Sequence, residues 1–270
     1  MDKTSQVSLV NNLFGIDMYK KGLVVFIDIL GTKDSNFTDL YNINKIFHKE
    51  LQRIKKEEIF CKKFVSSFSD CAYIIYEIHE DNENKEDDTA FRLYIHESLT
   101  DLALTLSAIQ INGFMCRGGI SYNDLFYEEK SNIIFGPAIN EANKLETEAV
   151  MPRVIVNDEL ANRLYKHEKK VIEDEFRKLI RKDEFDDRYY LNFLYVFSQF
   201  DYMDYDEGFF NDKIQLGDKE YTFDEYYNIL EKLSLDTIKN KTDHNIIAKH
   251  KWQLNYLRNH FKERGLKSKQ

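Results

Sequence analysis

The chain of 270 residues has few of the residues that form linkers, disulfides or metal clusters: two prolines, ten glycines and three cysteines. So few prolines and glycines exclude a long flexible linker, and we expect one sizeable core. An odd number of cysteines without close pairing favours a reducing compartment rather than a disulfide framework. No CxxC, HxH or HExxH spacing occurs, so the sequence predicts no zinc site.

Positive charges are outnumbered by negative ones, and the sequence also lacks long apolar runs. The 38 Lys and Arg residues against 47 Asp and Glu give a net charge of −9, which argues against general nucleic-acid binding. There is no apolar run long enough to predict a membrane-spanning helix. Residues 1–21 lack the basic-then-apolar pattern of a secretion signal. We therefore expect a cytoplasmic protein that binds neither nucleic acid nor membrane.

What the sequence does contain is a short apolar run, Val24 to Gly31, with one aspartate inside it. Such a run between Gly22 and Gly31 predicts a strand buried on both faces. An aspartate near the end of a buried strand is unfavourable unless it has a partner. For Asp28 that partner is either a metal ion or the backbone of the following turn.

Further elements follow this strand in alternating order. They are a helix over 38–57, a strand hairpin over 64–76 with its turn at Ser69–Asp70, a helix over 90–111, a strand pair over 114–127, a short strand over 132–135, a helix over 137–148 and a strand over 153–156. The order predicts a ferredoxin-like α+β fold, an antiparallel-rich sheet with helices packed on one face. We expect a lead-in over 1–22, a core over 23–165 and a mainly helical extension over 166–270 that packs on the core.

This arrangement places the first strand beside the hairpin, so that Asp28 and Asp70 converge. Two carboxylates brought that close repel each other unless a cation lies between them. Two protein carboxylates leave positions for water and phosphate oxygens, which is how Mg²⁺ or Mn²⁺ holds a nucleoside triphosphate.

Four motifs, in this order, resemble the core of the class III nucleotidyl cyclases. They are Phe26 to Gly31, Ser69-Asp70, Gly118-Gly119-Ile120 and Gly136 to Glu146. The resemblance covers residues 23–160. The residues of these motifs are most similar to those of the small bacterial cyclases of the Pycsar antiphage system, which make cyclic UMP or cyclic CMP. It implies that Asp28, Ile29 and Asp70 hold two Mg²⁺ or Mn²⁺ ions. It also implies that Leu30, Gly31 and Thr32 contact the phosphates, although the family usually has Phe at position 32.

The resemblance implies further roles on the helix over 137–148 and on two strands. Asn140 matches the residue that orients the ribose, and Lys144 stands where the family has an arginine. A lysine keeps the charge but loses the bidentate fork, so Lys144 is either catalytic or a solvated helix residue. The base-reading positions are Ser66 and Ile133, which match neither the adenine nor the guanine pattern. They are compatible with a pyrimidine, or are ordinary core residues.

The resemblance therefore implies a cyclase that converts UTP or CTP to the 3′,5′-cyclic monophosphate and pyrophosphate, as a messenger for a separate effector protein. It also implies a head-to-tail homodimer with active sites at the interface. Two alternatives stay open: an adenylate or guanylate cyclase with atypical base contacts, and a catalytically silent nucleotide-binding module. Outside these motifs, Arg117 either reaches a phosphate or forms a structural ion pair, and the second interpretation is favoured.

Overall fold

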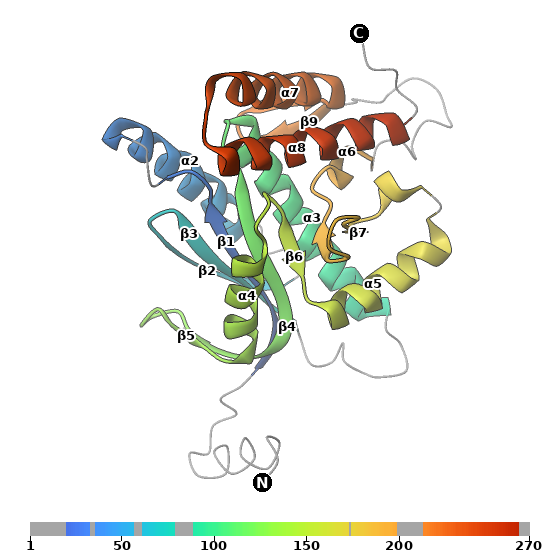
Figure 1. The fold of residues 1–270 in the computed structure, drawn as a ribbon. Helices are drawn as coiled ribbons and strands as arrows, with labels where there is room; N and C mark the ends of the chain where they lie inside the picture. The colour runs from blue at the N-terminus through green and yellow to red at the C-terminus, as the bar shows by residue number, and fades with distance from the viewer. Residues whose placement is uncertain are drawn as a thin grey trace, which may run out of the picture.

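The computed structural model describes residues 20–32, 36–56, 61–78, 89–172, 174–198 and 213–264 (Figure 1). Most of the predicted lead-in over 1–22 lies outside these ranges, and its last three residues already belong to the first strand. Within the described residues, no helix combines the length and apolarity needed to cross a membrane.

Four antiparallel strands form the centre of the molecule in the order β2-β3-β1-β4. They are β1 (Lys20–Ile29), β2 (Lys62–Phe68), β3 (Cys71–Glu77) and β4 (Cys116–Glu128). This is the ferredoxin-like order that the sequence predicts, and the fold class is confirmed. The strand β1 lies in the interior of the sheet because its run from Leu23 to Ile27 is apolar on both faces.

Beyond β4 the sheet continues with short strands. They are β6 (Val154–Val156), which is parallel to β4, followed by β8 (Tyr189–Leu191) and β7 (Ile180–Lys182). The far end of β4 pairs with β5 (Ile133–Phe135), and Figure 1 shows this hairpin projecting from the body of the molecule. The strand pair expected over 114–127 is wrong, because β4 runs through these residues without a turn.

Helices cover both faces of the sheet, which corrects the expectation of one covered face. Val25 and Ile27 pack with α2 (Phe37–Lys56) and α3 (Thr89–Ile111), whereas Val24 and Phe26 pack with α4 (Pro137–Glu148). The helix α4 lies directly on Gly119, where an added Cβ would stand 2.1 Å from the carbonyl oxygen of Ala142. Only glycine permits this close approach of helix to strand.

The C-terminal part is mainly helical, as predicted, but it also contributes strands. Its elements are α5 (Asp158–Val171), η2 (Glu175–Arg177), α6 (Tyr195–Ser198), β9 (Lys213–Leu216), β10 (Lys219–Thr222), α7 (Phe223–Asn240) and α8 (His244–Glu263). The boundary predicted after residue 165 falls within α5, and β7 and β8 continue the central sheet. Core and extension therefore share one sheet.

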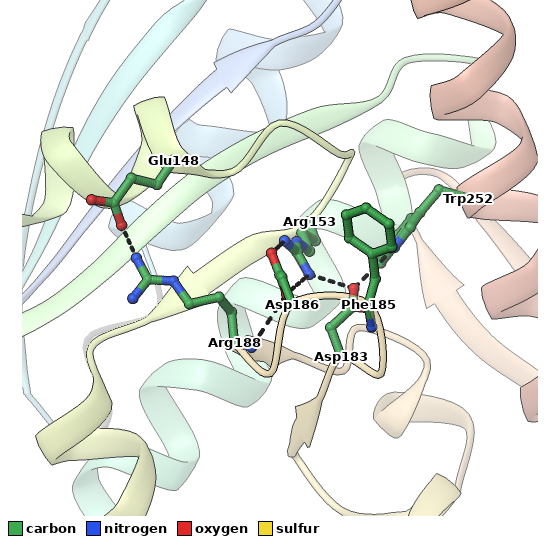
Figure 2. Close-up of polar contacts among 7 residues, drawn as sticks. All are labelled: Glu148, Arg153, Asp183, Phe185, Asp186, Arg188 and Trp252. Atoms are coloured by element: carbon green, nitrogen blue, oxygen red, sulfur yellow. Dashed lines mark hydrogen bonds and ion pairs between the residues drawn. The ribbon is translucent and has the colours of Figure 1, made fainter.

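A buried arginine joins this extension to the core (Figure 2). The Arg153 side chain is only 3% exposed, and its guanidinium forms ion pairs with Asp183 and Asp186 in the turn between β7 and β8. The indole Nε1 of Trp252 on α8 donates to Asp183 Oδ2 at 3.0 Å. One guanidinium thus fixes the β7–β8 turn and, through Asp183, α8.

A buried carboxyl group on α5 should make stability depend on pH. Burial raises the pKa of Glu168 from 4.5 to about 7, against the opposing effect of backbone N–H donors from Leu179 and Ile180 at 2.9 and 3.3 Å. The folded state therefore holds a proton that the unfolded chain releases, so this contribution is complete below pH 4.5 and is lost as the pH rises through 7.

The measurement is the free energy of unfolding of the wild type and of Glu168→Gln at pH 5 and pH 8. The wild type should lose about 2 kcal/mol more than the variant over this interval. Equal losses in the two proteins would show that Glu168 has an ordinary pKa in the fold.

Candidate functional site

Asp28 and Asp70 lie at the same end of neighbouring strands, as the strand order predicts. Asp28 is the last residue but one of β1 and pairs with Cys71, and the Ile29 N–H donates to the Asp70 carbonyl at 2.9 Å. The pKa of Asp28 is raised, first by burial and then by the Asp70 and Glu146 carboxylates, against the opposing effect of Arg117. The site is therefore a place of concentrated negative charge at one end of the central strands.

Arg117 and Glu146 complete this cluster. Arg117 Nε lies 2.5 Å from Glu146 Oε1 and 3.5 Å from Asp28 Oδ2, so the ion-pair interpretation of Arg117 is the one observed. Neither the sequence patterns nor the family resemblance predicted a role for Glu146. The spacing along the helix does indicate that Glu146 is buried, because it follows Ala138 and Ala142 at intervals of four on the buried face of α4.

The loop after β1 is only partly available to a ligand. The Leu30 N–H donates to the Met115 carbonyl at 2.8 Å, so it extends the pairing of β1 with β4. Gly31 turns the chain with φ of +90°. The Thr32 hydroxyl donates to Asp70 Oδ2. The phosphate contacts predicted for Leu30, Gly31 and Thr32 stay a prediction.

The donors in this cluster suit a hard divalent cation. Asp28 and Asp70 offer carboxylate oxygens, the ligand type that Mg²⁺ and Mn²⁺ prefer. In the part of the chain that the structure describes, no group of three or more His, Cys, Asp or Glu side chains is arranged to hold a metal ion. The two aspartates would therefore share a cation with water and phosphate oxygens. Burial is the main cause of the raised pKa of Asp28, and the charge of the cation would offset both this cost and the repulsion from Asp70 and Glu146.

Asn140 and Lys144 lie on the other side of α4 from this cluster. Both side chains are exposed, and they share a helix face because they are four residues apart. Lys144 and Glu146 point about 200° apart around the helix axis. The Lys144 side chain is 75% exposed, and its Nζ lies 3.7 Å from Glu148 Oε1. One chain therefore does not bring Asn140 and Lys144 to its own aspartates.

The two predicted base-contacting residues are also far apart within one chain. Ser66 is buried on β2 and lies level with Gly119 of β4. Ile133 is 47% exposed on β5 and pairs with Glu128, nine residues further along β4 than Gly119. The structure leaves their contact with a base as a prediction.

Tyr73 is a polar neighbour of Ser66 that the sequence patterns did not indicate, and Asn143 in turn contacts Tyr73. Tyr73 pairs with Ser66 across β2 and β3, and its ring stacks on Phe26 with centroids 4.4 Å apart. Asn143 Nδ2 on α4 donates to the Tyr73 hydroxyl at 3.2 Å. A tyrosine in an apolar strand gives no sequence signal of this contact, because strand pairing and helix placement create it.

No protein-family model matches the sequence, and no curated protein matches it. The adenylyl cyclase CyaB from P. aeruginosa is similar in structure, with 15% identity and a TM-score of 0.42 over 64% of this chain and 94% of that chain. An adenylate/guanylate cyclase/hydrolase from Silicibacter pomeroyi has 14% identity and a TM-score of 0.40 over the same shares. A bacterial light-regulated adenylyl cyclase has 17% identity and a TM-score of 0.29 over 56% and 48%. At these values, neither activity nor nucleotide carries over to this chain.

Proposed function

We propose that this chain is a metal-dependent nucleotidyl cyclase that acts on a pyrimidine nucleoside triphosphate, UTP or CTP. The products would be the 3′,5′-cyclic monophosphate and pyrophosphate. The observation that carries the proposal is the convergence of Asp28 and Asp70 at one end of the central strands, next to the turn at Gly31, in a chain whose motifs resemble class III cyclases.

Bound Mg²⁺ or Mn²⁺ would polarise the α-phosphate and lower the pKa of the ribose 3′-hydroxyl. The chain's own part is to hold and orient the groups. Asp28 and Asp70 supply the carboxylate oxygens, and the turn at Gly31 places the polyphosphate beside them. Asn140 would hold the ribose, and Lys144 would stabilise charge that develops on the phosphate.

The division of these groups between the two sides of α4 supports a two-fold homodimer. Asn140 and Lys144 face away from the aspartates of their own chain, and each is exposed on the surface. A second copy packed head to tail supplies the missing half of each site. Each dimer then has two sites, and each site uses Asp28 of one chain and Asn140 of the other.

The residues around the base-reading position support a pyrimidine. Ser66, Tyr73 and Asn143 are neutral hydrogen-bonding groups, whereas the resembling adenylate and guanylate cyclases have Lys or Glu at the position of Ser66. A hydroxyl suits the carbonyl and N3 edge of uracil or cytosine. The similarity of the motifs to Pycsar cyclases further supports a role in antiphage defence, with the cyclic nucleotide activating a separate effector.

The test is incubation of the purified protein with ATP, GTP, CTP and UTP in turn, with Mn²⁺ or Mg²⁺, and identification of products by mass. We expect a cyclic pyrimidine monophosphate that is absent with Asp70→Ala. A cyclic purine monophosphate would support the proposed cyclase activity and contradict the proposed pyrimidine substrate. If no product forms, even after addition of lysate from phage-infected cells, the result would favour a catalytically silent nucleotide-binding module. The ion pair of Lys144 with Glu148 is the structural argument for that alternative.

A further inference from the structure

A buried hydroxyl group reaches one of the two aspartates. Thr32 follows the turn at Gly31 and is only 7% exposed. Its Oγ1 donates a hydrogen bond to Asp70 Oδ2. The resembling family usually has phenylalanine at this position, and a phenyl ring has no hydrogen to donate. The contact is therefore a property of this chain's own sequence.

Asp70 is held at two points by the segment that also carries Asp28. Its backbone carbonyl accepts from the Ile29 N–H at 2.9 Å, and its carboxylate accepts from Thr32. Asp70 lies in the two-residue turn between β2 and β3, where Ser69 has φ of 52°. A tight turn alone leaves the side-chain rotamer open, and the hydrogen bond from Thr32 favours one orientation of the carboxylate.

Hydrogen bonds of this kind tune metal sites. A residue that donates to a ligating carboxylate fixes its orientation, and its loss typically lowers metal affinity by about 10- to 100-fold. A carboxylate oxygen that accepts one hydrogen bond keeps a second lone pair, and the other oxygen keeps both, so the donor does not displace a cation.

We propose that Thr32 is a positioning residue that orients the Asp70 carboxylate for binding a divalent cation. The proposal rests on the proposed function, because it takes Asp70 as a ligand. It assigns position 32 a role in the carboxylate's geometry that is separate from any contact of the loop with phosphate.

The experiment compares Thr32→Val, which keeps the shape and removes the hydroxyl, with Thr32→Ser, which keeps the hydroxyl. The full chain of each variant is titrated with Mn²⁺ alone, and unbound Mn²⁺ is measured by electron paramagnetic resonance. We expect Thr32→Val to raise the Kd by about 10- to 100-fold and Thr32→Ser to stay within about threefold of the wild type. Thermal unfolding checks that each variant is folded, and Thr32→Ala replaces Thr32→Val if the latter is not.

Two further variants separate the possible failures. Thr105→Val removes a fully buried hydroxyl from α3, on the opposite face of the sheet, and should leave the Kd unchanged. If Asp70→Asn abolishes Mn²⁺ binding while Thr32→Val does not weaken it, the role of Thr32 is wrong and the cation site stands. Equal weakening by Thr32→Val and Thr32→Ser also contradicts the role of Thr32. If Asp70→Asn binds Mn²⁺ as the wild type does, the cation site itself is wrong.

Discussion

Asp28→Asn should lower the rate of nucleotide cyclisation by about a thousandfold or more, because the loss of a metal ligand removes several kcal/mol of charge stabilisation. The fold should survive the change. Asp28 is partly buried beside the carboxylates of Asp70 and Glu146, and Arg117 keeps its ion pair with Glu146 at 2.5 Å. Removing one of three like charges should leave the free energy of unfolding unchanged or raise it.

The measurement pairs initial rates of product formation with denaturant unfolding of the same samples. Asp236→Asn, an exposed carboxylate on α7, is the matched control and should keep both values. A loss of activity together with a loss of stability would show that Asp28 is structural, and near-normal turnover would contradict its role as a ligand.

The division of each site between two chains can be tested with the same variant. Asp28→Asn and Asn140→Ala should each be inactive alone. When equal amounts are mixed and allowed to exchange subunits, half of the dimers contain one intact site of two, so about a quarter of the wild-type activity should return. If the mixture stays inactive although mixed dimers form, each chain carries its own complete site.

Arg153→Met should lower the free energy of unfolding by about 3–5 kcal/mol, the usual effect of removing one partner from a buried ion pair. The Arg153 side chain is 3% exposed, and its removal takes the ion-pair partner from both Asp183 and Asp186 (Figure 2). Methionine fills a similar volume, so the loss reports on charge and hydrogen bonds more than on a cavity. Burial acts to raise the pKa of Asp186, but Arg153 holds it below the ordinary value.

Two probes follow this unfolding independently. Trp252 is the single tryptophan of the chain and donates to Asp183, so its fluorescence reports the cluster, while far-ultraviolet circular dichroism reports the whole fold. Arg258→Met is the control, because its ion pair with Glu231 is on the surface with the Arg258 side chain 50% exposed, and it should cost under about 1 kcal/mol.

A rescue experiment completes this prediction. Adding Asp183→Asn and Asp186→Asn to Arg153→Met removes the two carboxylate charges that have lost their ion pair. This should recover part of the lost free energy of unfolding. No recovery, or an effect of Arg153→Met no larger than that of Arg258→Met, would show that the cluster does not hold the extension to the core.

Local sequence pattern was sufficient for the sheet that positions the site. The apolar run of β1 predicted a strand buried on both faces, and the turn residues at Ser69–Asp70 predicted the hairpin that brings Asp70 beside Asp28. The helix over 137–148 was predicted to the residue, because Pro137 and the spacing of its apolar side chains mark it locally. The continuous strand β4 was missed, because Asn123 and Asp124, two residue types that favour turns, lie in its middle.

The sequence by itself determined the strand order, the two aspartates and the residues of one helix, because hydrophobic period and turn chemistry act over a few residues. Only the tertiary structure decided what those residues touch. It placed Arg117 between Asp28 and Glu146, directed the Thr32 hydroxyl to Asp70 and left Asn140 exposed on the surface of α4. Such contacts join segments that are tens of residues apart, and their geometry is set by how helices and strands pack, which no local spacing records.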